Sequence, residues 1–154
     1  MGDEVRAALA AIARRWVESG WRHDDALPDG HIVDALHAPG FIDHDSGGRA
    51  ADNAGFREGI VRLLAAFPDL RAEARDCVVE ATCAGASGAC SGTVAVRWTA
   101  VGTQSGPYLG AAPTHRPIEF KGIEIIRVQD GRITERWGEW DGLELLAQLN
   151  RGTP

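Results

Sequence analysis

The stretch IEFKGIEIIRVQDGRITERWGEW, residues 118–140, decides the fold class of this 154-residue chain. Its first eleven residues alternate between two faces with the period of a β-strand. The dipeptide Asp130-Gly131 that follows is typical of a two-residue hairpin turn. Residues 132–140 then read as the antiparallel partner strand. The stretch therefore predicts a long β-hairpin.

Three helices are predicted in the N-terminal part of the chain, over residues 4–18, 31–38 and 54–66. In the first and the third, apolar side chains recur every three or four residues. A proline limits the second and the third helix at its C-terminal end, because proline disfavours helix in the residue before it. Between them, GFIDHD at residues 40–45 reads as a short extended piece entering a Gly-rich loop.

Strand-like sequence predominates after the third helix. Two runs flank a Gly/Ala/Ser-rich connection at residues 84–92, and an irregular link at residues 102–117 leads to the hairpin. A last helix is predicted at residues 141–150. Helices followed by antiparallel strands indicate an α+β fold rather than a parallel sheet with crossovers. We expect a single domain over residues 1–154, without room for a separate cofactor domain.

Composition excludes several classes of function. Sixteen basic and 22 acidic residues give a net charge of −6, which disfavours a nucleic-acid groove or an anionic membrane surface. No apolar run approaches the roughly 18 residues of a membrane span, and the N-terminus does not resemble a secretory signal. Cys77, Cys83 and Cys90 lack a CxxC pair, so we expect reduced thiols in a cytoplasmic protein without structural zinc. No GxGxxG follows a strand, so we expect no nucleotide cofactor.

Glu124 is the first candidate for chemistry. One face of its strand reads Ile118, Phe120, Gly122, Glu124, Ile126, Val128. If this face is buried, Glu124 is a lone carboxylate among apolar neighbours, and desolvation raises its pKa toward the range that suits general acid/base work. The alternative is a structural ion pair with an arginine such as Arg97 or Arg136.

His44 and Asp45 are the next candidates, since they lie where an extended segment meets a loop. A histidine beside an aspartate can relay a proton; the alternative is a loop histidine in water and an aspartate that caps a turn. Asp141, with Glu144 three residues later, predicts a capping box at the last helix, and catalysis is the second interpretation.

Large aromatic side chains surround the predicted sheet, namely Trp98, Tyr108, Trp137 and Trp140. Most are expected in the core, and one or two are expected to line a flat, conjugated ligand. Nucleophilic catalysis is not indicated, because there is no GxSxG elbow and the thiols lack a nearby histidine.

Several of these segments together resemble a known family. FIDHD, GFREGIVRLLAAFPDLR and the run from VAVRWTAVGTQ to the final helix are similar to SnoaL-like polyketide cyclases, within the superfamily of nuclear transport factor two and ketosteroid isomerase. The resemblance implies a cone-shaped fold: six twisted strands in a curved, antiparallel-rich mixed sheet around a pocket, three N-terminal helices covering it, a short C-terminal helix, and often a homodimer through the outer sheet. It also implies a cofactor-free aldol ring closure, in which a base removes a proton and an acid protonates the acceptor carbonyl.

The chain departs from that family at two positions. Gln104 stands where many relatives have histidine, and Gly138 stands where the catalytic aspartate of the aromatic polyketide cyclases falls. That aspartate is therefore not transferred to Asp141. By the resemblance to ketosteroid isomerase, Glu124 corresponds to the carbonyl-polarising acid and Asp45 lies nearest the base.

The sequence thus favours a cyclase or isomerase acting on an enolisable, polyketide-like molecule. Asp45 or His44 removes the proton, and Glu124, kept neutral by burial, stabilises the oxyanion. The predicted substrate-binding residues are Trp98, Gln104, Tyr108, Trp137 and Asp141. Three alternatives stay open: a non-catalytic small-molecule-binding protein, a dimerisation module with a residual pocket, and a hydratase or epoxide-opening enzyme that uses Glu124 with Asp45.

Overall fold

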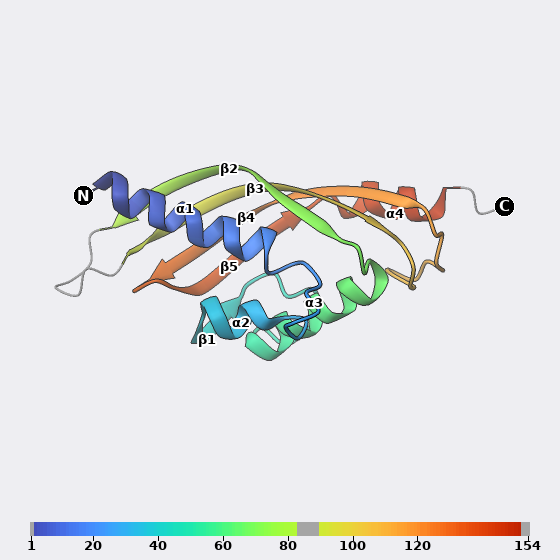
Figure 1. The fold of residues 1–154 in the computed structure, drawn as a ribbon, viewed down its shortest axis with the longest axis horizontal. Coiled ribbons are helices and arrows are strands. Elements are labelled where there is room, and N and C mark those ends of the chain that lie inside the picture. The colour runs from blue at the N-terminus through green and yellow to red at the C-terminus, as the bar shows by residue number, and fades with distance from the viewer. Residues whose placement is uncertain (1, 83–89, 152–154) are drawn as a thin grey trace.

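A curved sheet of five strands, in the order β1-β5-β4-β3-β2, is the scaffold of the computed structural model, which describes residues 2–82 and 90–151 (Figure 1). In chain order the elements are α1 (Gly2–Glu18), α2 (His31–Leu36), β1 (His37–Asp43), α3 (Asn53–Ala66), β2 (Arg71–Thr82), β3 (Ser91–Thr103), β4 (Pro117–Gln129), β5 (Arg132–Trp140) and α4 (Gly142–Asn150). β1 is parallel to β5, and the other pairs are antiparallel. The predicted α+β class is confirmed, with an open sheet.

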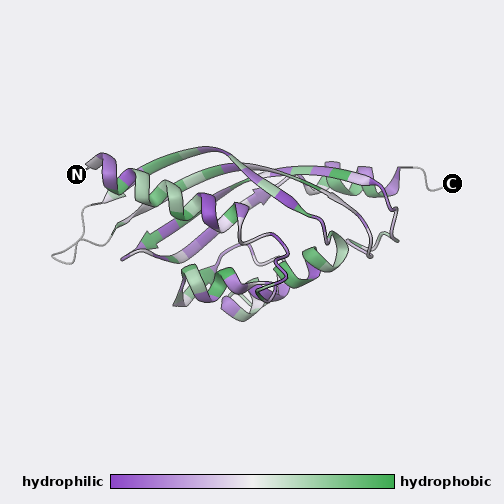
Figure 2. Ribbon diagram, in the orientation of Figure 1, coloured by the Kyte–Doolittle hydropathy of each residue, from purple (hydrophilic) through white to green (hydrophobic). Residues whose placement is uncertain are grey.

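The predicted hairpin is the β4–β5 pair. Asp130 and Gly131 have φ values of 50° and 78°, the left-handed backbone of a tight hairpin turn. Along β4, apolar and polar residues alternate (Figure 2). The face that carries Glu124 is the buried one, while Ile123 and Ile125 on the other face are about half exposed. The sequence assignment of the two faces of β4 is therefore correct.

The second helix is shorter than predicted, because it ends at Leu36 and β1 begins at His37. The His37 ring is buried and connects three elements: its Nε2 accepts a hydrogen bond from Trp16 Nε1 on α1 at 2.9 Å, and its Nδ1–H donates to Asn53 Oδ1 on α3 at 3.0 Å. Burial lowers the pKa of His37 to about 4. Backbone pairing of His37 with Ile133 of β5 overrides the local helical pattern.

α1, α2 and α3 cover the concave side of the sheet, and α4 lies at the end of the sheet beside β4 (Figure 1). α1 packs against β2 and β3, whereas α2 and α3 pack against each other and against β1. α4 packs against β4 with Leu145 and Leu149 buried. In α3, Asp52 is the N-cap and accepts a hydrogen bond from Gly55 N at 2.9 Å. This arrangement leaves a hollow between α3 and the centre of the sheet.

Some expectations concern strand number, thiols and assembly. The resemblance implies six strands, and this is wrong for the described residues, which form five. Cys77 and Cys90 are free thiols, as predicted, and Cys83 lies outside the described residues. No helix in the described part of the chain is long and apolar enough to cross a bilayer. Exposed isoleucines on the outer face of β4 are compatible with a homodimer, which stays a prediction.

Candidate active site

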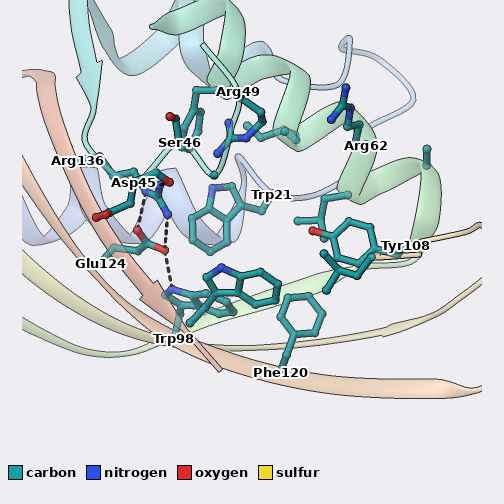
Figure 3. Close-up of a pocket in the computed structure, with 18 of the residues that line it drawn as sticks. Trp21, Asp45, Ser46, Arg49, Arg62, Trp98, Tyr108, Phe120, Glu124 and Arg136 are labelled. Atoms are coloured by element: carbon teal, nitrogen blue, oxygen red, sulfur yellow. Dashed lines mark hydrogen bonds and ion pairs between the residues drawn. The ribbon is translucent and has the colours of Figure 1, made fainter. Parts of the chain in front are cut away.

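A cavity of about 660 Å³ lies between the concave face of the sheet, α3 and the loop after β3 (Figure 3). Aromatic side chains form much of its wall, and ionisable ones gather at its margins. The lining residues that matter below are Trp21, Asp45, Arg49, Arg62, Trp98, Tyr108, Phe120, Glu124 and Arg136. The volume suits a drug-sized or bicyclic organic molecule.

Glu124 lies on this cavity wall, only 2% exposed. The expectation of a lone carboxylate is wrong, because Arg136 on β5 forms an ion pair with it: Nε to Oε2 is 2.8 Å and Nη2 to Oε1 is 3.3 Å. Trp98 Nε1 donates a third hydrogen bond to Oε1 at 3.3 Å. Of the two arginines considered as partners, Arg136 is the correct one. Arg97 instead pairs with Asp76 in an exposed position.

A second buried carboxylate, Asp43, competes for Arg136. Arg136 Nη1 donates to Asp43 Oδ1 at 2.8 Å and to the backbone oxygen of Asp45 at 3.0 Å. Asp43 also pairs with Arg49 at 3.4 Å. Arg136 is therefore shared between two desolvated carboxylates, of which Asp43 has Arg49 as a second partner, and this sharing limits how fully Arg136 neutralises Glu124.

These contacts and the burial of the site determine the pKa of Glu124. Burial raises the pKa of Glu124 to about 7 and outweighs the opposing effect of Arg136, and the nearby charge of Asp43 acts in the same direction as burial. Both protonation states are accessible close to neutral pH. A carboxyl with this property can exchange a proton with a bound molecule.

Gly138 makes room for this arrangement. It pairs directly with Glu124 across the β4–β5 ladder. A Cβ at this position would lie 2.1 Å from Glu124 Oε2 and 2.2 Å from Arg136 Nη2. The Glu124–Arg136 pair thus fills the space that a side chain at position 138 would take. At this place in the site the carboxylate is that of Glu124 on the neighbouring strand β4, and not one from position 138.

Asp45 and His44 have different environments. Along β1, Phe41 and Asp43 point inward and Ile42 outward, and continuing this alternation places His44 outside. His44 stacks on Trp137 with ring centroids 4.5 Å apart and lies 3.1 Å from Glu135. Neither His44 nor Trp137 lines the cavity, so the structure does not place these two residues where a substrate contact was expected.

Asp45, by contrast, lines the cavity. Its Oδ2 accepts a hydrogen bond from Gly138 N at 2.9 Å. Since Glu124 Oε2 occupies the space over Gly138, two carboxyl groups from distant parts of the chain meet at this glycine. Asp45 and Glu124, which were predicted to act together, therefore lie close to each other in the structure.

A β-bulge explains why Arg136, rather than Trp137, faces the cavity. Arg127 pairs with Glu135 and Val128 with Ile133, so Thr134 is an extra residue on β5. Without it, the register from the turn would bring Trp137 opposite Glu124 and turn Arg136 outward. The bulge reverses the two faces of the strand.

Of the remaining predicted binding residues, two line the cavity and two do not. Trp98 and Tyr108 line the cavity. Gln104 is fully buried but does not line it; its amide accepts from Thr114 N at 3.0 Å and donates to the Ala111 oxygen at 3.4 Å, which shapes the loop. Asp141 caps α4 by accepting from Glu144 N at 3.1 Å and also lies outside the cavity. Gln104 and Asp141 therefore do not line this cavity, and the capping role of Asp141 is confirmed.

Four residues of the site, Trp21, Asp43, Arg49 and Arg62, were not proposed from the sequence. Trp21 and Arg49 come from loops that carry no periodic signal, and Arg62 lies on α3. Asp43 was within reach, because alternation along FIDHD puts it on the side of Phe41. No cluster of three or more His, Cys, Asp or Glu side chains with metal-binding geometry occurs in residues 2–82 and 90–151.

Comparison with known proteins gives a consistent result. The family model for SnoaL-like polyketide cyclase matches residues 11–149. TsrD from Streptomyces laurentii is similar in structure, with a TM-score of 0.72, 25% identity and coverage of 94% of this chain and 96% of that one. IdmH from Streptomyces antibioticus, for which a polyketide cyclase function has been suggested, has a TM-score of 0.66 and 28% identity over 93% and 98% of the two chains. No protein of curated function has a significant sequence match.

Proposed function

Because the chain belongs to the SnoaL-like polyketide cyclase family, we propose that it is a cofactor-independent cyclase or isomerase for an enolisable small molecule. The supporting observation is the meeting of Asp45, Glu124 and Arg136 around Gly138, at the edge of a cavity of about 660 Å³. Two carboxyl groups in different environments are the usual basis of acid and base roles in one site.

Asp45 is the proposed base. It removes a proton from the carbon beside a substrate carbonyl, and the electron pair moves to the carbonyl oxygen as an enolate. Gly138 N–H orients the carboxylate through the 2.9 Å hydrogen bond. The exposed position of Asp45 at the cavity margin allows the proton to leave to solvent.

Glu124 is the proposed acid. In its protonated form it donates a hydrogen bond to the developing oxyanion, while Arg136 supplies positive charge behind it. In a ring closure, the enolate carbon attacks a second carbonyl of the same molecule, a C–C bond forms, and the new alkoxide takes the proton of Glu124. In an isomerisation, the proton returns to a different carbon.

Deuterium exchange tests the proton-transfer step without knowledge of the natural substrate. The bicyclic ketone 2-tetralone is incubated in D₂O with the protein, and incorporation at its carbon acids is followed by NMR. We expect faster exchange with wild-type protein and a loss of about 100-fold or more in Asp45→Asn, the range of general base catalysis. Glu124→Gln is expected to lower turnover far more than binding, whereas Glu119→Gln, on the exposed face of the same strand, serves as the matched control. Unchanged turnover in Glu124→Gln would remove that residue from the mechanism.

A non-catalytic binding protein is the second candidate. It is favoured by the hydrogen bonds that both oxygens of Glu124 already receive from Arg136 and Trp98. The departures at Gln104 and Gly138 point the same way. Binding of 2-tetralone and related ketones without any acceleration of exchange would support this candidate over the enzyme.

A further inference from the structure

The charged groups of the cavity lie on two walls (Figure 3). Glu124 and Arg136 come from the sheet. Arg62 comes from α3, and Arg49 comes from the loop before it. We call the side formed by Arg49, Arg62 and the cavity-facing residues of α3 the helix wall. Both ionisable side chains that define the helix wall are cationic, in a chain whose net charge is −6.

The charges on the sheet side are already matched. Arg136 uses Nε and Nη2 for Glu124, and Nη1 for Asp43 and the backbone of Asp45. Its side chain is only 9% exposed. An additional anion at this end would meet two carboxylates around one guanidinium. The sheet side is therefore a poor place for a permanently charged carboxylate of a ligand, in contrast to an oxyanion that accepts a hydrogen bond from protonated Glu124.

On the helix wall, Arg49 is also engaged, whereas Arg62 is not fully so. Arg49 lies across Gly59, where an added Cβ would be 2.7 Å from Nη1; it donates to the Gly55 oxygen at 2.7 Å and pairs with Asp43 at 3.4 Å. Arg62 pairs with Glu58 one turn earlier on α3, yet its side chain is 66% exposed while it lines the cavity. A guanidinium has five N–H donors, so Arg62 keeps donors for a ligand.

Two neutral groups in the cavity are also free to donate. No hydrogen bond links Trp21 Nε1 or the Tyr108 hydroxyl to the described part of the chain, although both residues line the cavity and are mostly buried. In residues 2–82 and 90–151, every fully buried side-chain nitrogen or oxygen has a hydrogen-bond partner. Trp21 Nε1 and the Tyr108 hydroxyl have none and are therefore not fully buried, and since both residues line the cavity, these donors are accessible from it. Burial raises the pKa of Tyr108, which keeps its hydroxyl protonated. A ligand that satisfies these donors presents hydrogen-bond acceptors to them, as the oxygens of a carbonyl or carboxylate group do.

We infer that the substrate carries a carboxylate, which binds at the helix wall through Arg62 with support from Arg49, while its apolar body lies along the aromatic side chains of Trp21, Trp98 and Phe120. This inference rests on the proposed function and specifies its substrate class. A guanidinium binds a planar carboxylate through two parallel hydrogen bonds. The aromatic wall is continuous, since Trp21 and Trp98 are 5.0 Å apart and Trp98 and Phe120 are 5.9 Å apart between ring centroids.

A pair of matched probes tests the inference by binding alone. Naphthalene-2-carboxylate and naphthalene-2-carboxamide have nearly the same shape and differ in charge. Their dissociation constants are measured by calorimetry at low ionic strength with wild-type protein, Arg62→Gln and Arg97→Gln. Arg97 is the matched control, an exposed arginine on the outer face that pairs with Asp76. We expect the wild type to bind the carboxylate about tenfold more tightly than the amide, with a preference that weakens as salt is added.

In Arg62→Gln the preference is expected to fall below about twofold, and in Arg97→Gln it is expected to persist. Equal affinities for the two probes in wild-type protein would overturn the inference, and so would a full carboxylate preference in Arg62→Gln. The comparison involves no turnover. A failure of 2-tetralone exchange therefore bears on the proposed function, whereas a failure of charge discrimination bears on the carboxylate subsite.

Discussion

The buried pair of Glu124 and Arg136 makes the stability of this protein depend on pH in a direction that one substitution can reveal. Glu124→Gln keeps the size of the side chain and one acceptor oxygen for Arg136 or Trp98, whereas its NH2 group cannot accept a hydrogen bond and the side chain cannot ionise. In the folded wild type, burial raises the pKa of Glu124 from its ordinary 4.5 to about 7. The folded chain therefore holds this proton between about pH 4.5 and pH 7, where the unfolded chain has lost it.

The sign follows from this difference. A carboxyl whose pKa is raised by folding favours the folded state at low pH, and this contribution is lost as the pH rises toward 7. At about 1.4 kcal/mol for each pH unit between 4.5 and about 7, the loss amounts to about 3 kcal/mol. The Glu124→Gln variant does not show this loss of stability, because its side chain at position 124 does not titrate. Its free energy of unfolding, relative to that of the wild type, should therefore rise by about 2 to 3 kcal/mol between pH 5 and pH 8.

Urea unfolding at pH 5, 6, 7 and 8 measures this quantity, and the other titrating groups cancel in the difference between variant and wild type. Glu119→Gln, on the exposed face of β4, should show a difference that is nearly independent of pH. A difference for Glu124→Gln that stays constant between pH 5 and pH 8 would mean that folding does not raise the pKa of Glu124, because a pKa at or below 4.5 changes the stability only below about pH 5. The acid role proposed for Glu124 would then be refuted.

Two further substitutions test the local geometry. Gly138→Ala places a methyl group within 2.2 Å of atoms of both Glu124 and Arg136. It should lower the free energy of unfolding by about 1–3 kcal/mol and abolish the exchange of 2-tetralone. Gly40→Ala is the control, because no atom lies within 4 Å of the added Cβ, and its stability and exchange rate should stay close to those of the wild type. Asp141→Ala should cost about 1 kcal/mol in urea unfolding through loss of the helix cap, with 2-tetralone affinity unchanged; weaker binding would show that the aspartate reaches the ligand.

The inward position of Glu124 was predictable because it depends on local order alone. Successive residues of β4 alternate between the buried and the exposed face of the sheet, and the tight turn at Asp130-Gly131 determines where the strand ends. The same rule predicts the position of Asp43, because the alternation from Phe41 onward turns Asp43 inward and His44 outward.

Trp137 lies outside the cavity, against the prediction, for a different reason. The extra residue Thr134 has no distinctive sequence signal, yet it shifts the ladder by one position and reverses which side chains face inward. The parallel pairing of β1 with β5 likewise joins segments about a hundred residues apart, and it converts His37 and its neighbours from predicted helix to strand.

The sequence by itself determined the elements that depend on neighbours along the chain: the hairpin, the buried face of β4, the apolar stripe of α3 and the aspartate that caps α4. These follow from side-chain periodicity and from the backbone preferences of turns and caps, which act over a few residues. Only the tertiary structure decided that Glu124 shares Arg136 with Asp43 and meets Asp45 across Gly138. Those contacts depend on ladder register and on packing between distant strands, and burial there, rather than residue type, sets the charge of the carboxyl group.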